Sequence, residues 1–153
     1  MATSLTFTSN AFTNMISFAT ASAATASGYQ PSSPATAYDI TGSTTSYDRR
    51  IYGINITNTF GTVETITVYL NDNAVKRQLF QLSVAANSGN STSVGSVDLF
   101  GSSLGSGIFQ KQKDANGIPY FNLPTGWSVS ASYGTTLTGA SLLIFTTFGE
   151  TYQ

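Results

Sequence analysis

Apolar and polar residues alternate with a period of two through most of this chain, and this pattern restricts it to β-structure. In the stretch 126–133, every odd position is apolar and every even position after Gly126 is serine. Successive side chains of a strand point to opposite faces, so the stretch predicts a half-buried β-strand. No segment shows the apolar stripe with a 3.6-residue period that is typical of an amphipathic helix.

The same pattern predicts further strands over residues 50–60, 63–70, 75–84, 96–100 and 139–148. Within the first of these, we expect Tyr52, Ile54, Ile56 and Phe60 to share one buried face. Turn-forming residues separate the stretches, and Gly61-Thr62 predicts a tight hairpin between its two neighbours. Pro119 and Pro124 predict that their segment is a sheet edge or a loop. The sequence therefore predicts an all-β fold, an antiparallel β-sandwich or jelly roll with an extended N-terminal arm.

The first 48 residues differ in kind from the rest. Leu5, Phe7, Phe12, Ile16 and Phe18 indicate one or two strands, and an uncharged linker rich in Ala, Ser and Thr follows over residues 19–37. So long a loop is uncommon inside a compact domain. We divide the chain into an N-terminal arm, residues 1–48, and a β-sandwich core domain, residues 49–153. The arm either crosses to a neighbouring subunit or forms a long crossover within one sandwich.

Aromatic residues in the arm are the candidate contact residues. Tyr29, Tyr38 and Tyr47 recur every nine residues, where no local core is expected to bury them. Aromatic anchors are typical of subunit interfaces. We therefore predict inter-subunit contacts by the aromatic residues of the arm and the basic pair after it: Phe12, Phe18, Tyr29, Tyr38, Tyr47, Arg49 and Arg50.

The scarcity of charge and of reactive side chains excludes several classes of protein. Only 8% of the residues are charged, the formal net charge is −1, and the chain has neither His nor Cys. Zinc sites of the usual ligand set, a haem with an axial His or Cys, and catalytic triads are excluded. The net charge does not favour nucleic acid as a partner. We also expect no cofactor, no metal ion, no signal peptide and no membrane segment.

Seven carboxylates remain as acid–base groups. Asp72 and Asp114 lie in turn motifs, and Asp48 is expected to pair with a neighbouring cation such as Arg49. A glycosidase needs two carboxylates that face each other across a sugar, for which Glu64 and Asp98 are the residues to test. We predict that the chain is not an enzyme. Trp127 alternates with core-type residues, so we favour a core position over sugar stacking.

From Tyr52 onward, the chain resembles small β-sandwich virion proteins of tailed bacteriophages. The resemblance covers about two thirds of the chain and rests on short motifs: Gly53-Ile54-Asn55-Ile56-Thr57-Asn58-Thr59, Thr65-Ile66-Thr67-Val68-Tyr69-Leu70, Leu82-Ser83-Val84-Ala85-Ala86-Asn87-Ser88-Gly89 and Leu123-Pro124-Thr125-Gly126-Trp127-Ser128-Val129-Ser130-Ala131. The Thr- and Ser-rich arm lies outside this pattern.

The resemblance implies an accessory capsid protein, of the decoration or cement type, that binds and stabilises the major capsid shell. Its partners are then the major capsid protein and further copies of itself, with a trimer favoured, and its location is the virion after synthesis in the host cytoplasm. Two alternatives stay open. One is a tail or appendage component that binds a receptor or a carbohydrate, and the other is a glycosidase that uses carboxylates.

Overall fold

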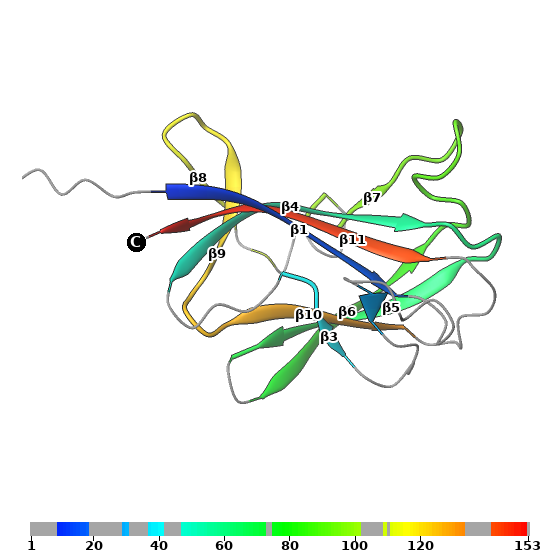
Figure 1. The fold of residues 1–153 in the computed structure, drawn as a ribbon, viewed down its shortest axis with the longest axis horizontal. Coiled ribbons are helices and arrows are strands. Elements are labelled where there is room, and N and C mark those ends of the chain that lie inside the picture. Colours follow the sequence, from blue (N-terminus) through cyan, green and yellow to red (C-terminus); the bar gives the residue numbers. More distant parts are fainter. Residues whose placement is uncertain are drawn as a thin grey trace, which may run out of the picture.

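The structure is a computed structural model, and it describes residues 9–18, 29–30, 37–41, 47–72, 75–101, 109, 111–133 and 142–152. Two β-sheets pack face to face around one apolar core (Figure 1). The predicted all-β sandwich is confirmed, and the described residues contain strands and turns but no helix.

The larger sheet has seven strands in the order β2-β1-β11-β4-β9-β8, and β7 also pairs with β4. The pairings β1–β11 and β11–β4 are antiparallel, and each joins ten pairs of residues. Strands β1 and β2 pair in parallel. Its strands are β1 (Ser9–Phe18), β2 (Tyr29–Gln30), β4 (Asp48–Asn58), β7 (Val97–Asp98), β8 (Gln112–Lys113), β9 (Pro119–Leu123) and β11 (Leu143–Tyr152).

The smaller sheet has four strands in the order β3-β10-β5-β6, all paired antiparallel. They are β3 (Tyr38–Asp39), β5 (Glu64–Asn71), β6 (Lys76–Val84) and β10 (Ser128–Tyr133). The inward residues of both sheets form the core, as alternation requires. Among the fully buried side chains are Ile51, Ile54, Ile66, Val129 and Phe145.

The described parts of residues 1–48 belong to this sandwich. β1 pairs with β11 along its whole length, and β3 pairs with β10. Both of these pairings are with strands of the same chain. Leu5, Phe7 and most of the linker lie outside the described residues.

Strand β10 is buried on both faces, so the prediction of a half-buried strand was wrong. Ser128, Ser130 and Ser132 are at most 6% exposed, although they face away from the core. Asp39 of β3 lies opposite Ser130, and its carboxylate accepts hydrogen bonds from the hydroxyls of Ser128 and Ser130. Serines can be buried here because their polar atoms keep partners.

The predicted hairpin at Gly61-Thr62 was also wrong. The segment links β4 to β5, which belong to different sheets, so it is an arch rather than a hairpin. The buried side chain of Asn58 holds this arch together. Its Nδ2 donates to the carbonyl oxygens of Thr62 (2.9 Å), Ala85 (3.0 Å) and Val84 (3.3 Å), and its Oδ1 accepts from the Phe60 amide (2.8 Å).

A second polar connection joins the sheets near β3. The Arg49 side chain is 1% exposed and donates to the carbonyl oxygens of Thr41 (2.8 Å) and Trp127 (2.6 Å). The Thr41 hydroxyl accepts from the Val129 amide of β10, and the Thr147 hydroxyl of β11 donates to the Ile40 carbonyl. Burial lowers the pKa of Arg49, and the nearby charge of Asp39 opposes this shift.

Tyr133 gives the core a measurable dependence on pH. Burial, and then the charge of Tyr38, raise the pKa of Tyr133 to about 12. An unfolded tyrosine titrates near 10. From about pH 10 to about 12 the unfolded state therefore binds fewer protons than the folded state, and the free energy of unfolding falls as the pH rises.

We expect denaturant unfolding of the wild type to show this fall in alkaline solution, and the Tyr133→Phe variant to show a shallower one. Tyr52 and Tyr152 contribute to the remaining slope, because their pKa values are also raised. Equal slopes for wild type and variant would contradict this assignment.

Candidate functional site

An aromatic cluster built around Arg50 lies on the outer face of the seven-stranded sheet. Arg49 and Arg50 are adjacent on β4, so strand alternation turns Arg49 inward and Arg50 outward. The Arg50 guanidinium carbon lies 4.6 Å from the ring centroid of Tyr120 on β9 and 4.2 Å from that of Tyr152 on β11. Cation–π contact with two rings fixes this side chain in place.

Hydrogen bonds fix the tyrosines in turn. Glu150 Oε2 accepts from the hydroxyls of Tyr152 (2.7 Å) and Tyr52 (3.0 Å), and the Tyr120 hydroxyl donates to Gln112 (2.9 Å). Burial, and then the hydrogen bond to Glu150, raise the pKa values of Tyr52 and Tyr152. Both phenols thus keep their protons, and with them their bonds to Glu150, beyond the usual range for tyrosine.

A β-bulge places Tyr52 in this cluster. The register of β4 against β11 shifts between Phe148 and Gly149, so that Phe148 pairs with Gly53 whereas Gly149 pairs with Ile51. The extra residue on β4 reverses which positions face the core. The prediction that Tyr52 shares the buried face of Ile54 was therefore wrong, because the bulge separates the two.

Gly149 allows the chain to pack closely at the bulge. A Cβ at this position would lie 2.6 Å from the Arg50 carbonyl oxygen and 2.7 Å from the ring of Phe12. Phe12 pairs with Gly149 across the β1–β11 ladder and packs against the core of its own chain. A side chain larger than hydrogen would displace either the Phe12 ring or the strand that carries Arg50.

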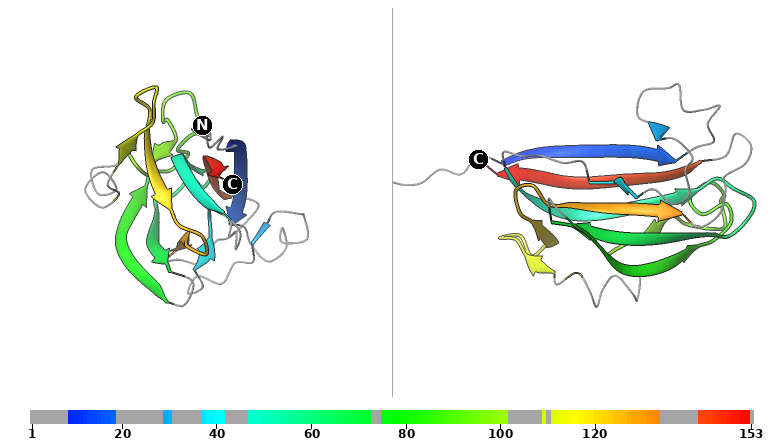
Figure 2. Two further views of the ribbon diagram at one scale, coloured as in Figure 1. Left: turned by 90° about the vertical axis from the view of Figure 1, so that its left-hand side faces the viewer. Right: turned by 90° about the horizontal axis from the view of Figure 1, so that it is seen from below.

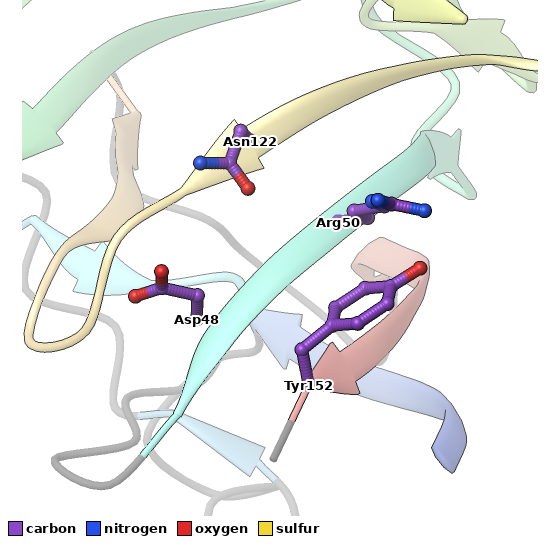
Figure 3. A pocket seen from close by; sticks show the side chains of 4 residues that line it. All are labelled: Asp48, Arg50, Asn122 and Tyr152. Carbon is purple, nitrogen blue, oxygen red and sulfur yellow. The ribbon is translucent and has the colours of Figure 1, made fainter. Parts of the chain in front are cut away.

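A pocket of about 360 Å³ opens beside the cluster and is lined by Asp48, Arg50, Asn122 and Tyr152 (Figure 3). Asp48 does not form the predicted ion pair with a neighbouring arginine. Its Oδ1 accepts instead from the amide (2.8 Å) and the hydroxyl (2.9 Å) of Thr125. Within the described part of the chain, Arg77 and Asp72 form an ion pair (3.0 Å), away from this pocket.

Two large apolar side chains are exposed on the same outer face. Met15 of β1 is 60% exposed and Phe148 of β11 is 40% exposed. Met15 pairs with Thr146, two residues from Phe148 on the same side of β11, so the two side chains are diagonal neighbours. We call Met15, Phe148 and the Arg50 cluster together the outer-face patch.

Most of the basic residues lie away from this patch, at the edges of the sheets. Lys76 and Arg77 are on β6, and Lys111 and Lys113 lie on or beside β8. β6 and β8 each end the strand order of their sheet. Charged side chains on an edge strand prevent another chain from adding to the sheet. The charges on β6 and β8 do not hinder association of this molecule with a partner through the face of a sheet.

The predicted contact residues are dispersed in the structure. Arg50 lies in the outer-face patch, Arg49 is buried between the sheets, and Tyr47 is exposed. Phe12 and Tyr38 pack against the core of their own chain. Phe18 pairs with Leu143 and Gln30, and Tyr29 pairs with Ser17, but the side chains of Phe18 and Tyr29 lie outside the described residues. Whether another subunit contacts any of them stays a prediction.

The carboxylates of the glycosidase alternative belong to opposite layers. Glu64 begins β5 of the four-stranded sheet and accepts from the Thr62 hydroxyl, whereas Asp98 ends β7 of the seven-stranded sheet and accepts from the Phe100 amide. Asp114 shapes the β8–β9 turn by accepting from the amides of Asn116 and Ile118.

Among the described residues, no group of three carboxylates could hold a metal ion. That part of the chain also holds no helix long and apolar enough to cross a membrane.

Sequence reasoning missed the partners of Arg50. Tyr120 and Asn122 fall in a segment that was predicted to be an edge or a loop because of its prolines, yet β9 pairs with β4. Glu150 and Tyr152 follow the predicted end of the last strand, which continues to Tyr152. The period-two spacing of Phe148, Glu150 and Tyr152 was the available signal.

Comparison of the chain with protein-family models, curated proteins and solved structures finds no match.

Proposed function

We propose that this chain is a virion structural protein, an accessory capsid protein that binds the major capsid shell through the outer-face patch. The observation that carries the proposal is the exposure of Met15 and Phe148 beside the clamped Arg50. The resemblance of residues 52–131 to small phage virion proteins supports the choice of partner.

The composition of the patch fits a protein partner. Tyrosine, phenylalanine, methionine and arginine are enriched in the cores of protein interfaces, and lysine, aspartate and glutamate are depleted there. Arg50 is already held between two rings, so binding would order little of its side chain. The carboxylate of the patch, that of Glu150, also suits an interface, because it is already bonded to the hydroxyls of Tyr52 and Tyr152.

Self-association is the second part of the proposal. The chain forms a homo-oligomer, with a trimer favoured, and acts in the virion without catalysing a reaction. Low charge supports this view, because a chain in which only 8% of the residues are charged has little electrostatic protection against association. Removing hydroxyl and amide groups from water also costs less free energy than removing charged groups, so a surface rich in such groups can be buried against another subunit.

The experiment is co-sedimentation with phage heads prepared without this protein. We expect Met15→Ser and Phe148→Ser each to weaken binding to the heads about tenfold, which is the loss typical of an interface anchor. Val63→Ser and Val75→Ser are matched controls, because these residues are comparably exposed but lie outside the patch. Equal binding by all four variants would overturn the proposed surface, and no binding by the wild type would overturn the function.

A further inference from the structure

We propose that the pocket between Asp48, Arg50, Asn122 and Tyr152 binds one neutral sugar residue of a glycan. This binding activity differs from attachment to a shell, and its argument does not depend on the proposed function, although the pocket shares Arg50 and Tyr152 with the outer-face patch. Its volume of about 360 Å³ lies at the lower end of the range for ligand pockets, which suits a single pyranose ring.

Three neighbouring strands supply the four side chains. Arg50 of β4 pairs with Asn122 of β9, and Asp48 of β4 pairs with Tyr152 of β11. Directly paired residues of an antiparallel ladder point to the same face, so all four side chains lie on the outer face, where they line the pocket (Figure 3). A site on paired strands is held more precisely than a site on loops.

The chemistry of the four groups favours a ligand with many hydroxyls. Arg50 offers hydrogen-bond donors, the Asp48 carboxylate offers acceptors, and the Asn122 amide offers both. A sugar hydroxyl donates and accepts at once, so neighbouring hydroxyls can satisfy such a mixed set. The Tyr152 ring adds an apolar wall against which the C–H groups of a sugar can pack.

The charges of the pocket select against ionic ligands. Asp48 is exposed and would repel a phosphate or carboxylate that approached Arg50, and Arg50 would repel a cation that approached Asp48. A neutral ligand is bound without either penalty. The ligand class is therefore a neutral sugar rather than an acidic one.

The site is also organised before a ligand arrives. Arg50 lies between two rings, the Tyr152 hydroxyl is bonded to Glu150, and Asp48 Oδ1 is bonded to Thr125. Because these side chains are already ordered, binding loses little conformational entropy.

The test uses ligand-observed NMR and calorimetry with the full chain. The probes are the methyl glycosides of glucose, galactose, mannose and N-acetylglucosamine, with N-acetylneuraminic acid and inorganic phosphate as the acidic probes. We expect at least one neutral glycoside to bind with a dissociation constant of about 1 mM and Asn122→Ala to weaken it about tenfold. Asn90→Ala, a change of the same type at an exposed turn outside the pocket, leaves the affinity unchanged.

Three results would overturn the proposal: no neutral glycoside binds, an acidic probe binds more tightly, or Asn122→Ala matches Asn90→Ala. Met15→Ser and Phe148→Ser separate this proposal from the previous one. We expect both variants to keep the affinity for the glycoside, because neither residue lines the pocket.

Discussion

Replacing Asn58 with alanine is expected to lower the free energy of unfolding by about 3 kcal/mol. The variant loses the hydrogen bonds from the two Nδ2 hydrogens, which are shared among three carbonyl oxygens, and the one accepted by Oδ1, at a position with no exposed surface. The Phe60 amide and three carbonyl oxygens would lose their partner inside the arch that joins the two sheets. Polar groups left without partners in a protein interior account for most of such a loss.

The measurement is urea unfolding followed by circular dichroism. Asn55→Ala is the matched control, because Asn55 lies on the same strand with its side chain on the outer face. We expect the control to change the unfolding free energy by less than about 0.5 kcal/mol, as most surface substitutions do. Equal losses for the two variants would show that the amide bonds of Asn58 do not hold the arch.

The two neighbouring arginines should give opposite results in stability and in binding. Arg49→Ala is expected to lower the free energy of unfolding by about 3 kcal/mol, because it removes a buried guanidinium that bridges the Thr41 and Trp127 carbonyls. Arg50→Ala should cost about 1 kcal/mol in stability, the value of partly exposed cation–π contacts. In contrast, Arg50→Ala should abolish sugar binding and weaken binding to phage heads.

The same unfolding assay, run beside the two binding assays, checks this pair. Arg49→Met provides a further test, since methionine restores much of the buried volume without the donors. It should remain less stable than the wild type, because the carbonyls stay without their partner. A loss of stability by Arg50→Ala as large as that of Arg49→Ala would contradict the assignment of the two residues to opposite faces.

The alternation of side chains was enough to predict the fold, because each face of a sandwich strand meets a different environment. Val63–Leu70 became β5 and Val75–Val84 became β6, each within one residue at its ends. The pattern does not record which strand is the neighbour. Gly61-Thr62 carries the residues of a tight turn, but the choice between hairpin and arch depends on the buried Asn58 and its three carbonyl partners.

The candidate site was harder to predict because it depends on a register shift. A single extra residue near Gly53 turns Tyr52 from the core to the outer face, at a place where Gly149 packs closely against Phe12 across another ladder. Contacts between residues more than a hundred positions apart leave no local signal. Arg50 was identified from its charge alone, whereas Tyr120 and Tyr152 became its partners only through the pairing of β9 and β11 with β4.

The pairing of the first and last described strands determines how the molecule bears mechanical load. β1 and β11 run side by side over ten residues, with Ser9 opposite Tyr152 at one end of the ladder (Figure 2). A force that pulls Ser9 and Tyr152 apart acts across the ladder, so its hydrogen bonds break one pair after another, as a zipper opens. A force along the strands loads all the bonds together. This ladder therefore resists tension along its strands better than tension that separates these two strand ends.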